Sequence, residues 1–411
     1  MKILIINRYF CEYSAVESLS YRLYEMLKNV GEDVYFFATD RKPYYEKNYN
    51  YSKYFPKDKL SFVEYIKNPI SYYWDFEASK KLDKMIKDIK PDIVHVNQPI
   101  TASIFKTLCK HNIPVVWTLH DSAIICGAYL KIGKKGYCKD FLCKNGFYLN
   151  CLLKKCKDDK FEPSLRKTIL GYINYLFNSY KCVDKFLTPS NALKDIVLSS
   201  TLNLPREKFV VLNNFYDVKE NNNEKLLDKN SYFLYVGRLV EEKGVQYILE
   251  ALKSLPRDIP LVIAGRGTYE NNLKKYAKEN NLHNVKFIGY VNYDEIDKLY
   301  KNAIATIVPS ICFEVFGMIN IESFANKTPV IAFDIGGIPE IIDNDLNGYI
   351  IPTGDVQSLA QCILKYWENP QIAVKHGENA FDKAKNKYSE QVYMQRLLEI
   401  YNELCNPQAR G

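Results

Sequence analysis

The stretch Pro309–Glu322 reads Pro-Ser-Ile-Cys-Phe-Glu-Val-Phe-Gly-Met-Ile-Asn-Ile-Glu and follows the apolar run Ala303–Val308. The apolar run predicts a buried strand, and the residues after Gly317 predict a helix, Met318–Asn326. Glycine allows the backbone to approach a ligand closely. A helix that begins at the carboxyl end of a strand presents N–H groups suited to phosphate. This stretch therefore predicts an α/β sheet with a phosphate site at the end of one strand.

Two carboxylates flank the predicted helix start, Glu314 in the loop before it and Glu322 on its second turn. They would repel a phosphate unless each has hydroxyl groups to bind. A sugar joined to a nucleoside diphosphate supplies hydroxyls at both ends, with phosphates between them. The alternative is a surface helix that carries two solvated glutamates.

The composition is that of a globular protein. The 411 residues predict two or three domains at ~150 residues each, and 47% hydrophobic with 25% charged residues is ordinary. No apolar run approaches the ~20 residues that span a bilayer. The run at Met1–Arg8 is too short for a secretory signal and predicts a first strand. Eleven scattered cysteines, an odd number, argue against a disulfide scaffold, so we expect a cytoplasmic protein.

Short apolar runs alternate with helical patterns, as in parallel α/β sheets. Twelve strands are predicted: Lys2–Asn7, Asp33–Thr39, Ile93–Asn97, Val115–His120, Lys185–Pro189, Phe209–Asn213, Tyr232–Gly237, Pro260–Ala264, Val285–Gly289, Ala303–Val308, Pro329–Phe333 and Gly348–Ile351. The polar segment Lys219–Lys225 is the predicted linker between two Rossmann-like halves. Ligands of such sheets bind at the carboxyl ends of the strands, so we expect a cleft there. The expected domains are residues 1–215 and 216–388, and a last helix, residues 389–411, is expected to pack back on the first.

Basic residues and turns follow several strands of the second half. Arg238 and Lys243 follow the first of these strands and could grip a diphosphate, or they could be ordinary surface charges. Gly265 and Arg266 form a predicted tight turn after the next strand. Backbone groups at Val291 could contact the edge of a base.

In the first half, His120 and Asp121 follow a predicted strand. A lone histidine is usually structural, but this one lies at a strand's carboxyl end beside a carboxylate. We therefore expect a functional role for His120.

Together these residues resemble glycosyltransferase family 4, which has the GT-B fold. The resemblance is spread over nearly the whole chain, and the Glu314…Glu322 pair with Arg238 and Lys243 is its most specific part. The other matching segments are Pro91–His95, Thr118–Asp121, Pro189–Asn191, Val236–Leu239, Gly336–Glu340 and Asn347-Gly348.

The resemblance implies transfer of a sugar from a nucleotide-sugar with retention at the anomeric carbon and without a catalytic metal. It implies that Arg238 and Lys243 hold the diphosphate, assisted by backbone N–H groups at Phe316, Gly317 and Met318.

The resemblance also assigns roles around the sugar and the nucleoside. Glu322 would bind the ribose diol, and Glu314 would bind donor-sugar hydroxyls. His120 would contact the donor sugar from the other domain. The chain departs from the family at Ser14 and Ala15, where Gly-Gly is common in the loop after the first strand. The loop is expected to lie near the phosphate or the acceptor, but reduced backbone freedom puts its direct contact with the phosphate in doubt.

A basic, cysteine-rich insertion occupies about residues 126–160. Four cysteines, Cys138, Cys143, Cys151 and Cys156, could form a structural zinc site, remain reduced thiols or form disulfides.

The formal net charge of +8 arises around this insertion. Residues 131–185 contain 13 Lys and Arg against 5 Asp and Glu, and apolar residues are interleaved with them. This pattern predicts contact with an anionic membrane surface, although a solvated lysine-rich insertion is the alternative.

We therefore expect a retaining enzyme that moves a hexose-type sugar from a UDP- or GDP-sugar to a glycan or lipid-linked acceptor. The expected setting is surface polysaccharide or glycolipid synthesis, with the protein cytoplasmic and peripheral on the inner face of the plasma membrane. One alternative is a nucleotide-sugar epimerase of the same fold. Another is a nucleic-acid-binding protein that uses the basic segment, although no nucleic-acid partner is expected from the other motifs.

Overall fold

The computed structural model describes residues 1–10, 15–39, 49–56, 74–98, 101–126, 128, 138, 143, 145–157, 159–177, 180–219, 225, 227–228 and 230–406. The chain divides into two compact units. The first contains residues 1–189, 193–212 and 394–411, and the second contains residues 190–192 and 213–393.

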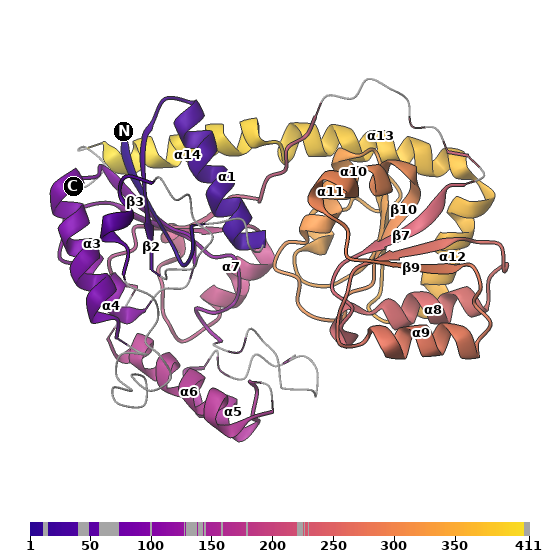
Figure 1. The fold of residues 1–411 in the computed structure, drawn as a ribbon, viewed down its shortest axis with the longest axis horizontal. Helices are drawn as coiled ribbons and strands as arrows, with labels where there is room; N and C mark the ends of the chain where they lie inside the picture. Colours follow the sequence, from indigo (N-terminus) through magenta and orange to yellow (C-terminus); the bar gives the residue numbers. More distant parts are fainter. Residues whose placement is uncertain are drawn as a thin grey trace. The chain divides into compact units, whose positions relative to one another are not determined.

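The first unit is built on a six-stranded parallel sheet in the order β2-β1-β3-β4-β5-β6 (Figure 1). Its strands are β1 Lys2–Asn7, β2 Asp33–Ala38, β3 Ile93–Val96, β4 Val115–Thr118, β5 Lys185–Thr188 and β6 Phe209–Val211. Its helices are α1 Ala15–Asn29, α3 Phe76–Ile89, α4 Ala102–Leu108, α5 Leu149–Leu153, α6 Phe161–Leu176 and α7 Asn191–Leu198. Strand β1 is buried from Ile3 onward, as a central parallel strand should be.

The second unit is also built on a six-stranded parallel sheet, in the order β12-β11-β10-β7-β8-β9. Its strands are β7 Tyr232–Val236, β8 Leu261–Ala264, β9 Val285–Gly289, β10 Ala303–Val308, β11 Val330–Phe333 and β12 Gly348–Ile351. Its helices are α8 Val245–Lys253, α9 Glu270–Glu279, α10 Tyr293–Asn302, α11 Met318–Ala325, α12 Val356–Glu368 and α13 Pro370–Lys387. Strands β7 and β10 lie at the centre, so the loops that follow them meet at one edge of the sheet.

The last helix, α14 (Glu390–Cys405), contributes its residues from Met394 onward to the first unit. Tyr401 is fully buried there, and its hydroxyl lies 2.5 Å from Nδ1 of His95 on β3. The other ring nitrogen of His95 lies 2.7 Å from the hydroxyl of Thr118 on β4. Burial lowers the pKa of His95 to about 3, so the imidazole is neutral in this polar contact.

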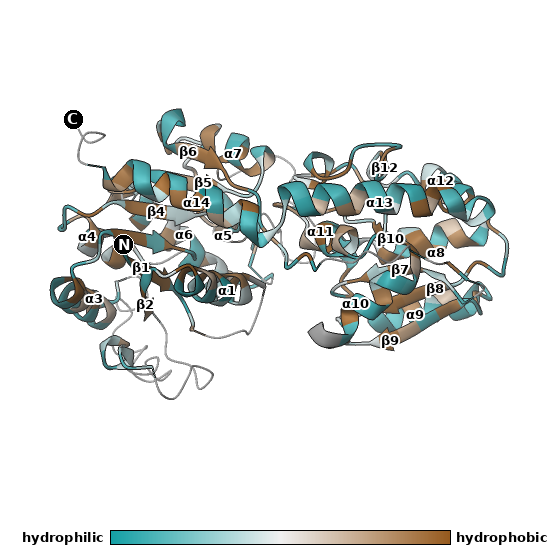
Figure 2. Ribbon diagram, turned by 90° about the horizontal axis from the view of Figure 1, so that it is seen from above, coloured by the Kyte–Doolittle hydropathy of each residue, from teal (hydrophilic) through white to brown (hydrophobic). Residues whose placement is uncertain are grey.

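Helices such as α3, α13 and α14 combine hydrophilic and hydrophobic residues, whereas the strands are largely hydrophobic along their length (Figure 2). In the second unit, α8 and α12 cover one face of the sheet and share a core with it. Helices α11 and α13 contribute to a second cluster around β11. Within the described residues, no helix has both the length and the apolar character that a bilayer span requires.

These observations confirm the predicted fold class. Each of the twelve predicted strands is present, with ends that differ from the prediction by no more than two residues. The last helix returns to the first unit, as expected from its position after the second sheet.

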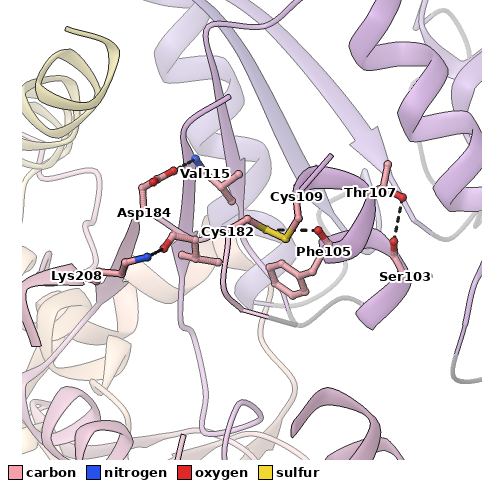
Figure 3. Close-up of a disulfide and its surroundings, with 9 residues drawn as sticks. Ser103, Phe105, Thr107, Cys109, Val115, Cys182, Asp184 and Lys208 are labelled. Carbon is pink, nitrogen blue, oxygen red and sulfur yellow. Dashed lines mark hydrogen bonds between the residues drawn. A yellow bond between two sulfur atoms is a disulfide. The ribbon is translucent and has the colours of Figure 1, made fainter. Parts of the chain in front are cut away.

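One covalent link was not predicted. Cys109, which follows α4, forms a disulfide with Cys182, which precedes β5, with 5.1 Å between their Cα atoms (Figure 3). The two cysteines are 73 positions apart, so no local spacing indicated their pairing. Of the cysteines in the described residues, this is the one disulfide pair, and the expectation of a chain without a disulfide scaffold did not include it.

Candidate functional site

In the second unit, the loops after β7, β8 and β9 are held together by backbone hydrogen bonds. The N–H of Gly265 donates to the carbonyl of Gly289 over 2.7 Å, and that of Gly237 donates to Ala264 over 3.0 Å. A Cβ on Gly265 would lie only 1.8 Å from the carbonyl oxygen of Gly237, so glycine is required there. The strand ends therefore form a fixed backbone surface.

The predicted donor-binding residues of this surface differ in exposure. Arg238 and Arg266 are exposed to solvent, and Val291 is half-buried. The carbonyl of Arg238 accepts a hydrogen bond from the Tyr235 hydroxyl over 2.9 Å, which fixes the turn that carries its side chain. Arg238 and Arg266 are therefore accessible cations on a rigid support.

Lys243 lies in a short 3-10 turn, Glu241–Lys243, and forms an ion pair with Glu314. Burial alone would lower the pKa of Lys243, but the Glu314 carboxylate outweighs that effect and raises it. The hydroxyl of Ser310, which is buried, donates to the same Glu314 oxygen over 2.6 Å. Glu314 is thus held by two donors and is not a solvated surface glutamate.

Backbone contacts fix the position of the Glu314 loop. The N–H of Gly337 donates to the carbonyl of Glu314 over 2.7 Å, and that of Ile311 donates to Glu242 over 3.0 Å. The loops that follow β7, β10 and β11 are therefore joined at Glu314.

Helix α11 begins directly after this loop. Its first turn follows Gly317, whose φ of +102° favours glycine. Among the described residues, no side chain caps the N-terminus of α11, and the helix has Met318 at its first position. Phe316 is buried against Tyr388, with ring centroids 5.8 Å apart, so the loop is anchored in the core just before the helix.

Glu322 lies on the second turn of α11, as predicted. The hydroxyl of Tyr300, from α10, donates to its carboxylate over 2.9 Å. Burial raises the pKa of Glu322, the Tyr300 hydrogen bond partly opposes this, and the nearby Asp297 carboxylate adds to it. Asp297 and Tyr300 were not singled out from the sequence, because a tyrosine and an aspartate at helical spacing are ordinary in a surface helix.

The first unit contains His120 and Asp121 just after β4. The Nε2 of His120 lies 3.3 Å from the side-chain oxygen of Asn97. Burial lowers the pKa of His120 to about 4, so its imidazole is neutral at neutral pH. Burial also raises the pKa of Asp121 to about 6. Ser14 lies outside the described residues, and Ala15 is the first residue of α1.

For the four cysteines of the insertion, the sequence left a structural zinc site, reduced thiols and disulfides open. Cys138, Cys143, Cys151 and Cys156 are buried thiols. A hydrogen bond to Cys126 and burial raise the pKa of Cys143, while a hydrogen bond between Cys151 and Cys156 raises the pKa of the first and lowers that of the second. Among the described residues, no group of three or more His, Cys, Asp or Glu side chains is arranged to hold a metal ion.

Known proteins match this chain over both units. A model of the family Glycosyltransferase Family 4 matches residues 16–220, and a model of Glycosyl transferases group 1 matches residues 217–383. An uncharacterised glycosyltransferase of Methanocaldococcus jannaschii is 31% identical over 364 residues, which cover 82% of this chain and 83% of that protein. A capsular polysaccharide biosynthesis glycosyltransferase of Staphylococcus aureus is 28% identical over 228 residues, which cover 54% of this chain and 58% of that protein. The structure of an Anabaena protein in complex with UDP-glucose is similar with a TM-score of 0.65 at 17% identity, over 98% of this chain and 100% of that chain.

Proposed function

This chain belongs to the family 4 glycosyltransferases, and from that membership we propose that it transfers a hexose from a UDP- or GDP-sugar to a hydroxyl group with retention at the anomeric carbon. The observation that supports this proposal most is the arrangement of Lys243 and Glu314 beside the N-terminus of α11. A cation, a carboxylate and a helix N-terminus together suit a ligand that has both phosphates and hydroxyls.

We propose that Arg238 and Lys243 bind the diphosphate of the donor. Arg238 is exposed and can bind phosphate oxygens through its planar guanidinium group. Lys243 would leave Glu314 and bind the diphosphate, because the doubly charged diphosphate competes with Glu314 for the ammonium group. Backbone N–H groups at the start of α11 would add hydrogen bonds to the leaving group.

Glu314 and Glu322 would then bind different parts of the donor. Once Lys243 turns to the diphosphate, Glu314 accepts hydrogen bonds from sugar hydroxyls while Ser310 still holds it. Glu322 binds the ribose diol, since a carboxylate accepts from two neighbouring hydroxyls. Loop backbone at Gly265 and Val291, with Arg266, contacts the nucleotide.

In the proposed reaction, the bond between the anomeric carbon and the departing phosphate oxygen breaks as the acceptor oxygen bonds to that carbon. The acceptor proton passes to the departing phosphate oxygen, so no separate protein base is required. His120, neutral because burial lowers its pKa, serves as a hydrogen-bonding group for the sugar. No catalytic metal is part of this proposal.

Surface polysaccharide or glycolipid synthesis is the proposed setting. It rests on the similarity to the capsular polysaccharide biosynthesis enzyme.

A thermal-shift screen against UDP-, GDP-, ADP- and dTDP-sugars tests the donor proposal, because a ligand that binds the folded state raises the apparent stability. We expect one nucleotide class to raise the Tm and the Lys243→Ala variant to lose most of that shift. A chain that none of these donors stabilises would contradict the assignment.

The reaction itself is tested by product analysis with the donor that binds. Release of the nucleoside diphosphate with an acceptor glycoside of unchanged anomeric configuration is expected. Conversion of the donor into an epimeric nucleotide-sugar would instead identify an epimerase.

A further inference from the structure

Exposed apolar side chains are concentrated on helices α5 and α6 and the segments beside them. Of the ten large apolar side chains that are exposed in the described part of the chain, six belong to residues 147–177. They are Phe147, Leu153, Phe161, Tyr175, Leu176 and Phe177. Leu153 is 67% exposed and Leu176 is 75% exposed, so these side chains do not contribute to the core of the unit.

Helix α6 is unusual because its buried side chains are polar. Ser164 and Thr168 are its two buried residues, while its leucines and isoleucines stay at least partly accessible. The Thr168 hydroxyl contacts the carbonyls of Tyr148 and Ser164 at 3.1 and 3.0 Å. The Ser164 hydroxyl accepts a hydrogen bond from the N–H of Lys157 over 3.0 Å. The helix thus packs through a polar stripe and leaves Phe161, Tyr175 and Leu176 exposed.

The packing of α5 and α6 is close, so this surface has a rigid support. A Cβ on Gly171 of α6 would lie 2.4 Å from the ring of Tyr148, which is buried beside the start of α5. The rings of Tyr148 and Tyr172 meet edge to face with centroids 5.3 Å apart. The exposure of the apolar residues is therefore a property of a packed helix pair, which lies at the lower edge of the first unit in Figure 1.

Cations accompany these apolar residues. Lys154, Lys155 and Lys160 are exposed, and within the described residues no carboxylate pairs with any of them. Arg166 is instead paired with Glu162. Unpaired lysines beside exposed leucine and phenylalanine side chains are complementary to a partner that carries negative charges at its surface and apolar groups below them.

Aromatic residues continue the surface beyond α6. The rings of Phe177 and Trp74 lie 5.2 Å apart, and the ammonium group of Lys106 lies 5.5 Å from the centroid of Trp74. Phe76, beside Trp74, is 61% exposed. Aromatic and lysine side chains together are typical of the boundary between lipid headgroups and acyl chains.

We propose that this docking surface, made of the six apolar residues with Lys154, Lys155 and Lys160, binds the surface of an anionic phospholipid bilayer. The lysines attract the charged headgroups, and the leucine and phenylalanine side chains enter the boundary region. The proposal does not depend on the donor site of the second unit.

Co-sedimentation of the full chain with phosphatidylcholine vesicles, with and without phosphatidylglycerol, tests the proposal. We expect binding to the vesicles that contain phosphatidylglycerol. The variant Lys154→Glu/Lys155→Glu should lower the partition coefficient by about tenfold or more, because each lysine near an anionic surface contributes appreciably. The control Lys275→Glu/Lys278→Glu on α9 makes the same change in net charge at exposed lysines of the other unit and should change binding by less than about twofold.

A second pair of variants tests the apolar part. Leu153→Gln/Leu176→Gln should weaken binding to the anionic vesicles, whereas Val30→Gln/Leu346→Gln, at exposed positions elsewhere, should not. Unchanged Tm and donor binding confirm that each variant is folded.

Three results would overturn the proposal. They are no binding to anionic vesicles, equal binding to both kinds of vesicle, and a dimer in sedimentation velocity that the leucine variant dissociates. The last result would identify the surface as a contact between copies of this chain.

Discussion

Lys243 and Glu314 form an ion pair that joins the loop after β7 to the loop after β10. The Glu314 carboxylate oxygen that pairs with Lys243 also accepts a hydrogen bond from the hydroxyl of Ser310, so the pair is part of a small polar network. In the proposed reaction both partners contact the donor, one at the diphosphate and the other at the sugar.

Substitution of either partner should therefore impair catalysis strongly. We expect Lys243→Ala and Glu314→Ala each to lower kcat by at least ~100-fold, the scale of losing one transition-state donor. The effects should not add in the double variant, because each single change also removes the ion pair. Steady-state kinetics measures this, with Lys253→Ala, an exposed ion-paired lysine of α8, as the control. Near-wild-type turnover in both variants would remove the proposed site.

Removal of the Tyr300 hydroxyl should affect donor binding more than turnover. In Tyr300→Phe, Glu322 loses a hydrogen bond that lowers its pKa, so the pKa should rise further above its usual range. Glu322 would then become protonated at a higher pH than in the wild type. We expect a severalfold higher KM for the donor, which increases as pH falls, with kcat nearly unchanged. A kcat that falls as much as kcat/KM would place Tyr300 in the chemical step instead.

His120 should support turnover as a neutral group. Because burial lowers its pKa to about 4, it should remain uncharged from pH 7 down to about pH 5. We expect His120→Ala to lower kcat while the affinity for the nucleoside diphosphate, measured by calorimetry, stays nearly intact. The variant should lose activity by the same factor at pH 5.5 and pH 7.5. Because the pKa of the neighbouring Asp121 is raised to about 6, the comparison is made in an Asp121→Asn background, where a factor that changes across this range would show that His120 titrates there.

Lys225 should make the stability of the protein depend on pH. It is buried, contacts the carbonyl of Tyr300 at 3.4 Å and also donates to Thr328. Burial lowers its pKa to about 7, below its ordinary value near 10.5, so the unfolded chain binds the proton more tightly. Protonation of Lys225 therefore lowers the free energy of unfolding. This destabilisation is fully present below pH 7 and disappears as pH rises toward about 10.5.

Urea unfolding from pH 7 to pH 10 measures that effect. As pH rises and this destabilisation disappears, we expect its loss to add a rise to the urea concentration at the unfolding midpoint of the wild type. The Lys225→Met variant should lack this contribution. Lys298→Met, at an exposed lysine, should follow the wild type. Parallel curves for the wild type and Lys225→Met would show that folding does not lower the pKa of Lys225.

The sequence predicted the sheets well because parallel strands that are buried on both faces are continuous apolar runs between polar helices. It also predicted the neighbourhood of Glu314 and Lys243, because both follow strands whose carboxyl ends share an edge. It did not reveal Tyr300 as the partner of Glu322, since that contact depends on how α10 packs beside α11.

Long-range and buried polar contacts were the main omissions. Lys225 lies in the segment that was interpreted as a polar linker, yet its side chain is buried. Its hydrogen-bond partners, Tyr300 and Thr328, are distant in sequence and reach it only in the folded chain. The Cys109–Cys182 disulfide likewise depends on the fold and not on spacing. The burial of Ser164 and Thr168 in α6 reverses the pattern expected from hydropathy, so the exposure of apolar residues such as Leu176 could not be assigned from periodicity.

The contact between Tyr401 and His95 has a consequence for synthesis on the ribosome. The six strands of the first sheet emerge before residues 213–393 of the second unit, whereas the helix that covers His95 emerges after them. At ~5–20 residues per second, this leaves the first sheet without its final helix for on the order of 10 s. During that interval the nascent chain exposes apolar surface of the first unit, so the emergence of α14, rather than completion of the unit's own strands, ends the vulnerable period of its folding.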